Sequence, residues 1–284
     1  MAELNIRAAT PSDLDAAIPL LALSFPGAQK FSHEFLRWQY YANPVGAPLG
    51  CNIDDGTQML GHLMGIPIEV TLRGEPRLVT LIMNIAVHPA QRGRGLFKTL
   101  VETVITLSAA RGHAGVIGVA NQNSVAAFEQ GLGFQNVAGL HAHIECLPHR
   151  IAMDSALRHA EFAHRWTSAS LTWRLSNPFN PLRVVDQRSD SLIIEGASNW
   201  SALRTRAVVP RGDLTWNGEE IVLLRPAVVI GLIPKGSLRP GLRVTIPQRL
   251  RPSPLRLIYF DHAPQAVPLD PQRILFNFLD FDAF

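Results

Sequence analysis

Cysteine is scarce in this sequence, and long apolar runs are missing. The 284 residues include two cysteines, Cys51 and Cys146, which do not form a Cys-x-x-Cys motif. This pattern favours free thiols in a reducing compartment. The sequence begins without a basic leader before an apolar stretch, and no window approaches the roughly 20 apolar residues of a membrane span. We therefore expect a cytoplasmic protein with no membrane partner.

Lysine is also rare. Of the 26 basic residues only three are lysines, and the chain carries a formal net charge of +3. Nucleic-acid binding is typical of sequences with basic runs or with basic residues interleaved among aromatic ones, and this sequence has neither. We interpret the excess of arginine over lysine as a general feature of the composition, with some of the arginines binding anionic ligands. No nucleic-acid partner is expected, and the length and 47% hydrophobic content predict one or two domains.

Residues 81–97 are the most informative segment. An apolar run from Leu81 to Val87 ends at His88-Pro89, which predicts a buried strand and a turn. Arg92-Gly93-Arg94-Gly95 then precedes apolar residues at helical spacing, which predicts a helix from residue 96 to about residue 111. Glycines let the backbone approach an anion, and the first amides of a helix favour a phosphate. The segment predicts a phosphate-binding helix N-terminus.

The segment that follows repeats the alternation of strand and helix. Val116–Ala120 predicts a second buried strand, and Asn121–Ser124 predicts the cap of a short helix over 125–130. Gly133-Phe134 then precedes another predicted strand. A glycine-rich turn alone is weak support for a phosphate site, so the prediction depends on this whole order of elements.

With these elements in place, residues 4–145 resemble the GNAT superfamily of acyl-CoA-dependent N-acyltransferases. Its motif is Val-x-Pro-x-x-Arg-Gly-x-Gly, then Asn-x-x-Ala/Ser, then a helix ending in Gly-Phe. The matching residues are Val87, Pro89, Arg92, Gly93, Gly95, Asn121, Ser124, Gly133 and Phe134. The resemblance implies an α/β (α+β) GNAT fold with a central mixed, largely antiparallel sheet flanked by helices. It also implies acetyl-CoA or another acyl-CoA as co-substrate, and no metal.

The resemblance further implies where the cofactor lies. The pyrophosphate of CoA is expected on the amides of residues 92–97, and the pantetheine arm on the strand edge at residues 85–87. The oxyanion is expected to meet a strand amide near Ile85, where these enzymes splay their strands. The residues expected to bind acyl-CoA are Ile85, Ala86, Val87, Gln91, Arg92, Gly93, Arg94, Gly95, Leu96, Phe97, Asn121, Ser124 and Phe128.

The catalytic groups are harder to assign. Many members of the superfamily carry a tyrosine acid four residues before the glycine of Gly-Phe, and Glu129 occupies that place here. His141 and His143 share one face of a predicted strand with Glu145, which suggests a catalytic or substrate-contacting role; a metal site and a plain solvated face are the alternatives. Asn84 is expected to orient a water or the substrate, or to be a satisfied polar core residue.

The second half carries a faint copy of the first. Leu171-Thr172-Trp173 and Asn177-Pro178 repeat the Leu-x-Trp and Asn-Pro of residues 36–44 about 135 positions later, which predicts a second, degenerate GNAT-like half. No Arg-Gly-x-Gly follows a strand there, so it is not expected to bind CoA. We place the domains at 1–148 and 149–284, with the second shaping the acceptor pocket.

The sequence thus predicts an N-acyltransferase that moves an acetyl or other short acyl group to a primary amine of a small molecule in a ternary complex. The phrase at residues 36–46 resembles a bacterial branch associated with polysaccharide and amino-sugar biosynthesis, which suggests an amino sugar or sugar nucleotide as acceptor. A homodimer is left open. The alternative is a catalytically weak acyl-CoA-binding or regulatory module.

Overall fold

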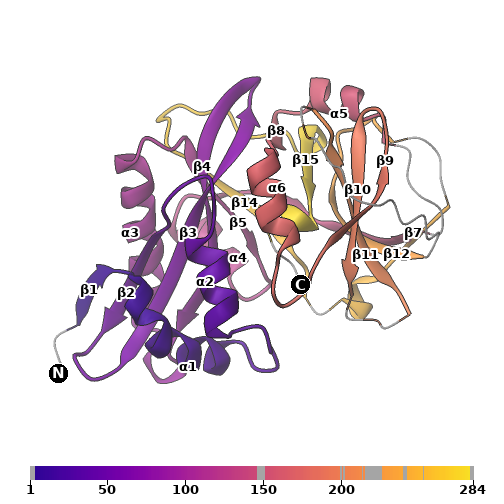
Figure 1. The fold of residues 1–284 in the computed structure, drawn as a ribbon. Coiled ribbons are helices and arrows are strands. Elements are labelled where there is room, and N and C mark those ends of the chain that lie inside the picture. Colours follow the sequence, from indigo (N-terminus) through magenta and orange to yellow (C-terminus); the bar gives the residue numbers. More distant parts are fainter. Residues whose placement is uncertain are drawn as a thin grey trace.

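The computed structural model describes residues 4–145, 151–198, 200, 202–212, 214, 226–238, 242–251 and 253–281 (Figure 1). Cys146 and the last residues of the chain, 282–284, lie outside these residues. In the first half the elements are β1 (Asn5–Ala8), α1 (Leu14–Ser24), α2 (His33–Tyr41), β2 (Leu49–Asp54), β3 (Met59–Leu72), β4 (Glu75–Val87), α3 (Leu96–Ala110), β5 (Gly115–Ala120), α4 (Val125–Gly131), β6 (Gln135–Gly139) and β7 (His141–Glu145).

The second half begins with α5 (Met153–His159). The other elements are β8 (Phe162–His164), α6 (Ser168–Leu175), β9 (Arg183–Gln187), β10 (Ser191–Ala197), β11 (Arg204–Pro210), β12 (Ala227–Leu232), β13 (Arg243–Thr245), β14 (Arg256–Asp261) and β15 (Ile274–Asn277). Short 3-10 turns lie at Pro11–Asp13, Pro89–Gln91, Gln248–Leu250, Pro271–Arg273 and Phe278–Asp280.

The described strands pair into one mixed sheet, as predicted. Its order is β6-β14-β5-β4-β3-β8-β15-β12-β11-β10-β9, with β1, β2, β7 and β13 attached beside this path. Three pairs are parallel, namely β4 with β5, β8 with β15 and β11 with β12, and the others are antiparallel. The long hairpin of β3 and β4 turns at Arg73 and Gly74, whose φ angles of 52° and 86° suit a tight hairpin turn.

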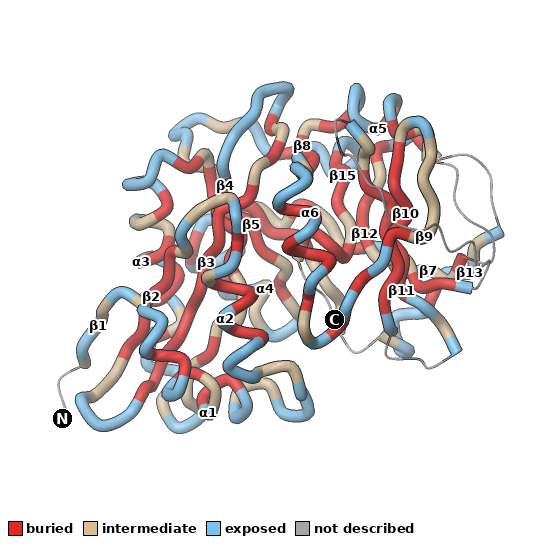
Figure 2. The backbone as a smooth tube through the Cα atoms, in the orientation of Figure 1, coloured by how far each residue is buried: buried red, intermediate tan, exposed pale blue. Residues whose placement is uncertain are grey.

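Each half contributes one strand to the sheet of the other. β14 lies between β5 and β6 of the first half, although it comes more than 110 residues after β6. In return, β7 leaves β6 and pairs with β12 and β13 of the second half. The largest hydrophobic core also contains residues of both halves, among them Tyr40 and Phe276. Buried backbone runs through the strands of both halves (Figure 2). The predicted boundary near residue 148 therefore falls between segments that share strands and core.

Two buried tryptophans join α2 to α6. Trp38 Nε1 donates to the carbonyl oxygen of Trp173 at 3.0 Å, and Trp173 Nε1 donates to the carbonyl oxygen of Trp38 at 3.0 Å. Their ring centroids are 5.3 Å apart, and the guanidinium of the buried Arg174 lies 4.4 Å from the Trp173 ring centroid. The repeated Leu-x-Trp phrase therefore marks a reciprocal contact between two helices.

We expect Trp38→Phe and Trp173→Phe each to lower the free energy of unfolding by about 1 to 3 kcal/mol, because each removes a buried hydrogen bond and leaves a small cavity. Urea denaturation measures the change. Trp200→Phe is the matched control, since Trp200 is 40% exposed. Equal stability of the Trp38 variant and this control would contradict a bonded, packed pair.

Candidate active site

The predicted phosphate-binding loop opens helix α3. Gly93 and Gly95 have φ angles of 77° and 80°, and Gly95 is the N-cap residue. An added Cβ at either glycine would meet nothing within 4 Å, so the left-handed backbone, rather than crowding by the protein, calls for glycine. Arg92 and Arg94 are exposed beside them. The loop thus presents backbone amides, the positive end of a 15-residue helix and two cations to solvent.

The strand before this loop has an edge available for a ligand. β4 pairs with β5 only through Thr80 and Leu81, while β4 continues to Val87 and β5 to Ala120. On its other edge β4 pairs with β3 along nearly its whole length. Within the part of the chain that the structure describes, a parallel pair that stops this early leaves backbone groups of residues 82–87 without a partner strand on that side. This arrangement agrees with the strand splay that the resemblance implies.

A β-bulge interrupts β4 next to that edge. Met64 pairs with Met83 and His62 pairs with Ala86, so Asn84 and Ile85 together oppose the single residue Leu63. Asn84 has a φ of 53°, a strained value for a residue other than glycine. The bulge lies where the oxyanion-binding amide was expected.

The side chain of Asn84 is tied to helix α2. Its Nδ2 donates to Gln39 Oε1 at 2.6 Å and to Tyr40 Oη at 2.7 Å. Tyr40 Oη lies 3.4 Å from His62 Nε2, and His62 Nδ1 lies 2.7 Å from Asn52 Oδ1. Gln39, Tyr40, His62 and Asn52 are all buried, with at most 2% of their surface exposed.

The hydrogen-bonding roles of these side chains determine which atom carries each proton. Asn84 donates to the Tyr40 hydroxyl, which leaves the hydroxyl proton to donate to His62 Nε2, and Nδ1–H then donates to Asn52. Burial lowers the pKa of His62 to about 4 and raises the pKa of Tyr40. Both side chains are therefore neutral near pH 7. Sequence reasoning missed Gln39, Tyr40 and His62 as site residues, because only the pairing of β3 with β4 brings them under Asn84.

The phrase at residues 36–46 has a structural explanation. Trp38 binds α6, and Tyr40 supports Asn84. Asn43 Nδ2 donates to the carbonyl oxygen of Pro67 at 2.8 Å, while its Oδ1 accepts from Val45 N at 3.1 Å. These contacts fasten helix α2 and the turn after it to the sheet.

Helix α4 carries the other residues expected near the cofactor. Asn121 Oδ1 accepts from the backbone nitrogens of Asn123 and Ser124, so this side chain shapes the turn that begins the helix. Phe128 is buried between Phe97 and Phe134, at ring-centroid distances of 5.2 and 4.9 Å.

Glu129, also on α4, is exposed. It occupies the place of the tyrosine acid on the solvent side of the helix.

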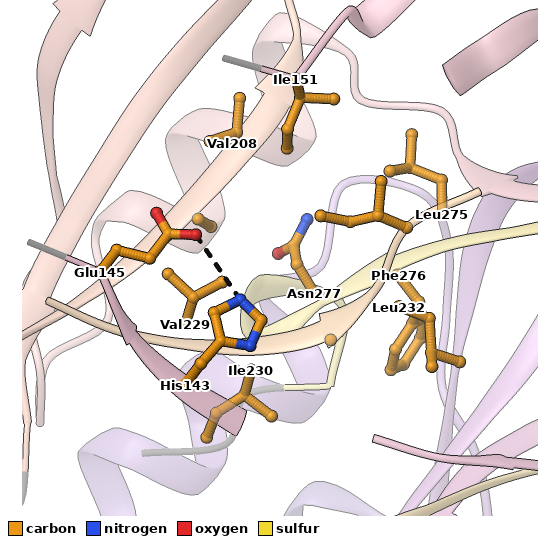
Figure 3. Close-up of a pocket in the computed structure, with 13 residues that line it drawn as sticks. His143, Glu145, Ile151, Val208, Val229, Ile230, Leu232, Leu275, Phe276 and Asn277 are labelled. Atoms are coloured by element: carbon orange, nitrogen blue, oxygen red, sulfur yellow. Dashed lines mark ion pairs between the residues drawn. The ribbon is translucent and has the colours of Figure 1, made fainter. Parts of the chain in front are cut away.

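The two histidines lie on β7, and the strand that pairs with β6 and β5 of the first half is β14. β7 instead carries them into the second half, where His141 is exposed. His143 lines an otherwise mostly apolar pocket with Glu145, and His143 Nε2 lies 3.5 Å from Glu145 Oε1 (Figure 3). Among the described residues, no group of three His, Cys, Asp or Glu side chains is placed to hold a metal ion.

The buried His62 predicts acid sensitivity. Its folded-state pKa of about 4 lies below the usual value of 6.5, so the unfolded chain binds a proton that the folded chain excludes. This contribution to stability is present above pH 6.5 and is lost as the pH falls towards 4. We expect it to remove about 2 kcal/mol of unfolding free energy between pH 7 and pH 5.

Urea denaturation of wild type and His62→Gln at both pH values measures this loss, which the variant should lack. His33→Gln is the control, because His33 is exposed and pairs with Asp15 at the surface. The same pH dependence in wild type and His62→Gln would show that another group is responsible.

Comparisons with known proteins agree with this geometry. Residues 5–135 match the sequence model of a family described as an acetyltransferase (GNAT) domain. No curated protein matches the chain. None of the helices in the described part has the length and apolar character to cross a membrane.

Solved structures share the fold over most of the chain. A probable N-acyltransferase from Enterococcus faecalis has a TM-score of 0.59 at 10% identity, covering 90% of this chain and 72% of its own. A GCN5-related N-acetyltransferase from Kribbella flavida also has a TM-score of 0.59, at 13% identity over 90% of this chain and 71% of its own. A putative acetyltransferase from Pyrococcus horikoshii has a TM-score of 0.57 at 12% identity, covering 96% and 93%. The match of the family model identifies residues 5–135, a little under half of the 284 residues, as a GNAT acetyltransferase domain.

Proposed function

We propose that this protein transfers an acetyl or other short acyl group from acyl-CoA to the primary amine of a small molecule. One observation carries the proposal. A glycine loop with a left-handed backbone opens α3 directly after the free edge of β4, within the residues that match the acetyltransferase family. The fold neighbour from Enterococcus faecalis is itself described as a probable N-acyltransferase.

In this proposal the backbone binds the cofactor. The amides of residues 92–97 hold the pyrophosphate, and Arg92 and Arg94 add positive charge. The pantetheine arm extends the sheet along residues 85–87. Phe97 contributes its amide while its ring packs on Phe128. The side chains of Asn121, Ser124 and Phe128 support this site by shaping α4.

The reaction follows from these positions. The neutral amine nitrogen attacks the thioester carbonyl carbon, the carbon–sulfur bond breaks, and the products are an amide and CoA thiol. The nitrogen loses one proton and the thiolate gains one, so the sum is balanced. An amide at the β4 bulge near Ile85 stabilises the oxyanion, and Asn84 orients the amine or a water. Glu129, His141 and His143 stay predictions for the proton transfers.

We also propose that the second half is a degenerate copy of the first. The parallel pair of β11 and β12 is short, like that of β4 and β5, and each half takes its outer strand from the other. Past this short pairing, Gly231 and Leu232 of β12 pair with β15. The chain's own strand thus fills the place that corresponds to the pantetheine edge in the first half. The second half then serves to shape the acceptor pocket.

The chemical class of the acceptor has less support than the acyl transfer itself. An amino sugar or sugar nucleotide is the first amine to test, because of the phrase at residues 36–46. Its residues Trp38, Tyr40 and Asn43 serve packing and support, which explains their presence without a sugar. The alternative of a weakly catalytic acyl-CoA-binding module is favoured by the exposed Glu129 in place of a tyrosine acid.

Acetyl-CoA is expected to raise the melting temperature of the wild type, and Gly95→Glu is expected to abolish this rise, because a carboxylate would occupy the phosphate site. Gly74→Glu is the matched control, since Gly74 also has positive φ and open space at the hairpin turn. Both variants carry a similar backbone strain of about 1 kcal/mol. Loss of the response in both variants, or in neither, would contradict a cofactor site at Gly95.

Thiol release over a panel of amines then separates the enzyme from the binding module. Release that depends on the amine supports the transferase. Binding of acyl-CoA without release supports the alternative.

Isothermal titration is expected to give one acyl-CoA per chain, because β15 closes the second half's counterpart of the site. The Gly95→Glu variant should show no residual binding. A stoichiometry near two, or binding that survives in the variant, would contradict the assignment of the second half.

A further inference from the structure

We propose that Tyr40 and His62 are positioning residues that fix the carboxamide of Asn84 with its Oδ1 available to the acceptor amine. The inference rests on the proposed function and assigns two residues that neither touch the cofactor loop nor belong to its motif. It begins from Asn84, a partly exposed residue at the bulge of β4, beside the edge expected to receive the acyl thioester.

The orientation of this carboxamide follows from its donors. A carboxamide nitrogen has two N–H groups, and Asn84 uses them on Gln39 and Tyr40 at 2.6 and 2.7 Å. The oxygen Oδ1 is therefore the side-chain atom that remains to accept a hydrogen bond from an amine. A rotated carboxamide would place its N–H groups there and would repel the attacking amine's own donors.

Tyr40 fixes the Asn84 carboxamide in this orientation only if the Tyr40 hydroxyl accepts a hydrogen bond from Asn84 Nδ2. The hydroxyl proton must then go elsewhere, and His62 Nε2 lies 3.4 Å away to receive it. His62 Nε2 is an acceptor only in the tautomer with a proton on Nδ1, and that proton points to Asn52 Oδ1 at 2.7 Å. The low pKa of His62 keeps the ring in its neutral form.

The same hydrogen bonds also stabilise the unfavourable backbone conformation of Asn84. A φ of 53° at Asn84 costs on the order of 1 to 3 kcal/mol unless its surroundings compensate. Two short hydrogen bonds that Asn84 donates to a fully buried tyrosine and a buried glutamine supply that compensation. A bulge held by buried groups keeps the neighbouring amide at Ile85 in place as well.

The test compares two tyrosines on one helix. Tyr40→Phe removes the hydroxyl that accepts from Asn84, and Tyr41→Phe makes the same change at the adjacent residue, which has no part in the network. With an amine that wild type acetylates, we expect Tyr40→Phe to lower kcat at least about tenfold and to leave KM for acyl-CoA within about twofold. Tyr41→Phe should leave both constants within about twofold.

Two histidine variants provide a rescue comparison. His62→Gln retains an acceptor for Tyr40 and a donor for Asn52, and should keep kcat close to wild type. His62→Leu retains neither and should resemble Tyr40→Phe. Equal losses in both histidine variants, accompanied by equal losses of melting temperature, would indicate a purely structural role and overturn the inference.

An NMR measurement makes the inference independent of turnover. The side-chain amide protons of Asn84, assigned by their loss in Asn84→Asp, should exchange slowly in wild type and in Tyr41→Phe, and fast in Tyr40→Phe. Unchanged exchange or unchanged kcat in Tyr40→Phe would overturn the positioning role. Wild type that binds acyl-CoA but acylates no amine would instead overturn the proposed function, which separates the two failures.

Discussion

The backbone ladders of the two exchanged strands are the constraint on which the rest of the structure depends. β5 needs a partner along the edge that faces away from β4, and β14 supplies one over all six of its residues. β12 obtains the same support from β7. Buried peptide groups that lost these partners would each carry a large desolvation cost. Neither half therefore has a complete sheet without the other.

This constraint reaches the candidate active site. The position of β5 relative to β4 decides where the edge of β4 becomes free, and β5 is held in place by a strand from the second half. The contact between Trp38 and Trp173 does the same for α2, which carries the groups that bind Asn84. The second half thus helps to position the residues of the candidate site.

The geometry of the candidate site depends mainly on the backbone conformation of three residues. Gly93, Gly95 and Asn84 all have positive φ, the two glycines in the loop before α3 and Asn84 at the bulge of β4. The glycines adopt this conformation at little cost, whereas Asn84 needs side-chain support from α2. A network of neutral, buried groups provides it, and such a network rigidifies a site without introducing an unpaired charge.

Motifs with fixed local spacing could be predicted from the sequence. The strand, glycine loop and helix of residues 81–110 are where the pattern predicted them, because their geometry depends on neighbours within a few residues. The mixed, largely antiparallel sheet was expected from the resemblance to the GNAT superfamily, and the structure has it. The pairing of β7 with β12 was not predicted, because the partner of a strand is decided by pairing energies along the whole chain and not by the residues next to it.

The sequence by itself determined the glycine loop, the apolar strand before it and the helix behind it, since turn conformation, periodicity and the helix dipole act over a few residues. It also contained the repeated Leu-x-Trp phrase but not its meaning. Only the tertiary structure decided that the two phrases bind each other, that β7 and β14 exchange, and that Tyr40 and His62 meet beneath Asn84. Those contacts join residues from 22 positions apart, for Tyr40 and His62, to 146 positions apart, for Gly115 and Asp261, and they form because the continuous sheet and its shared core bury them together.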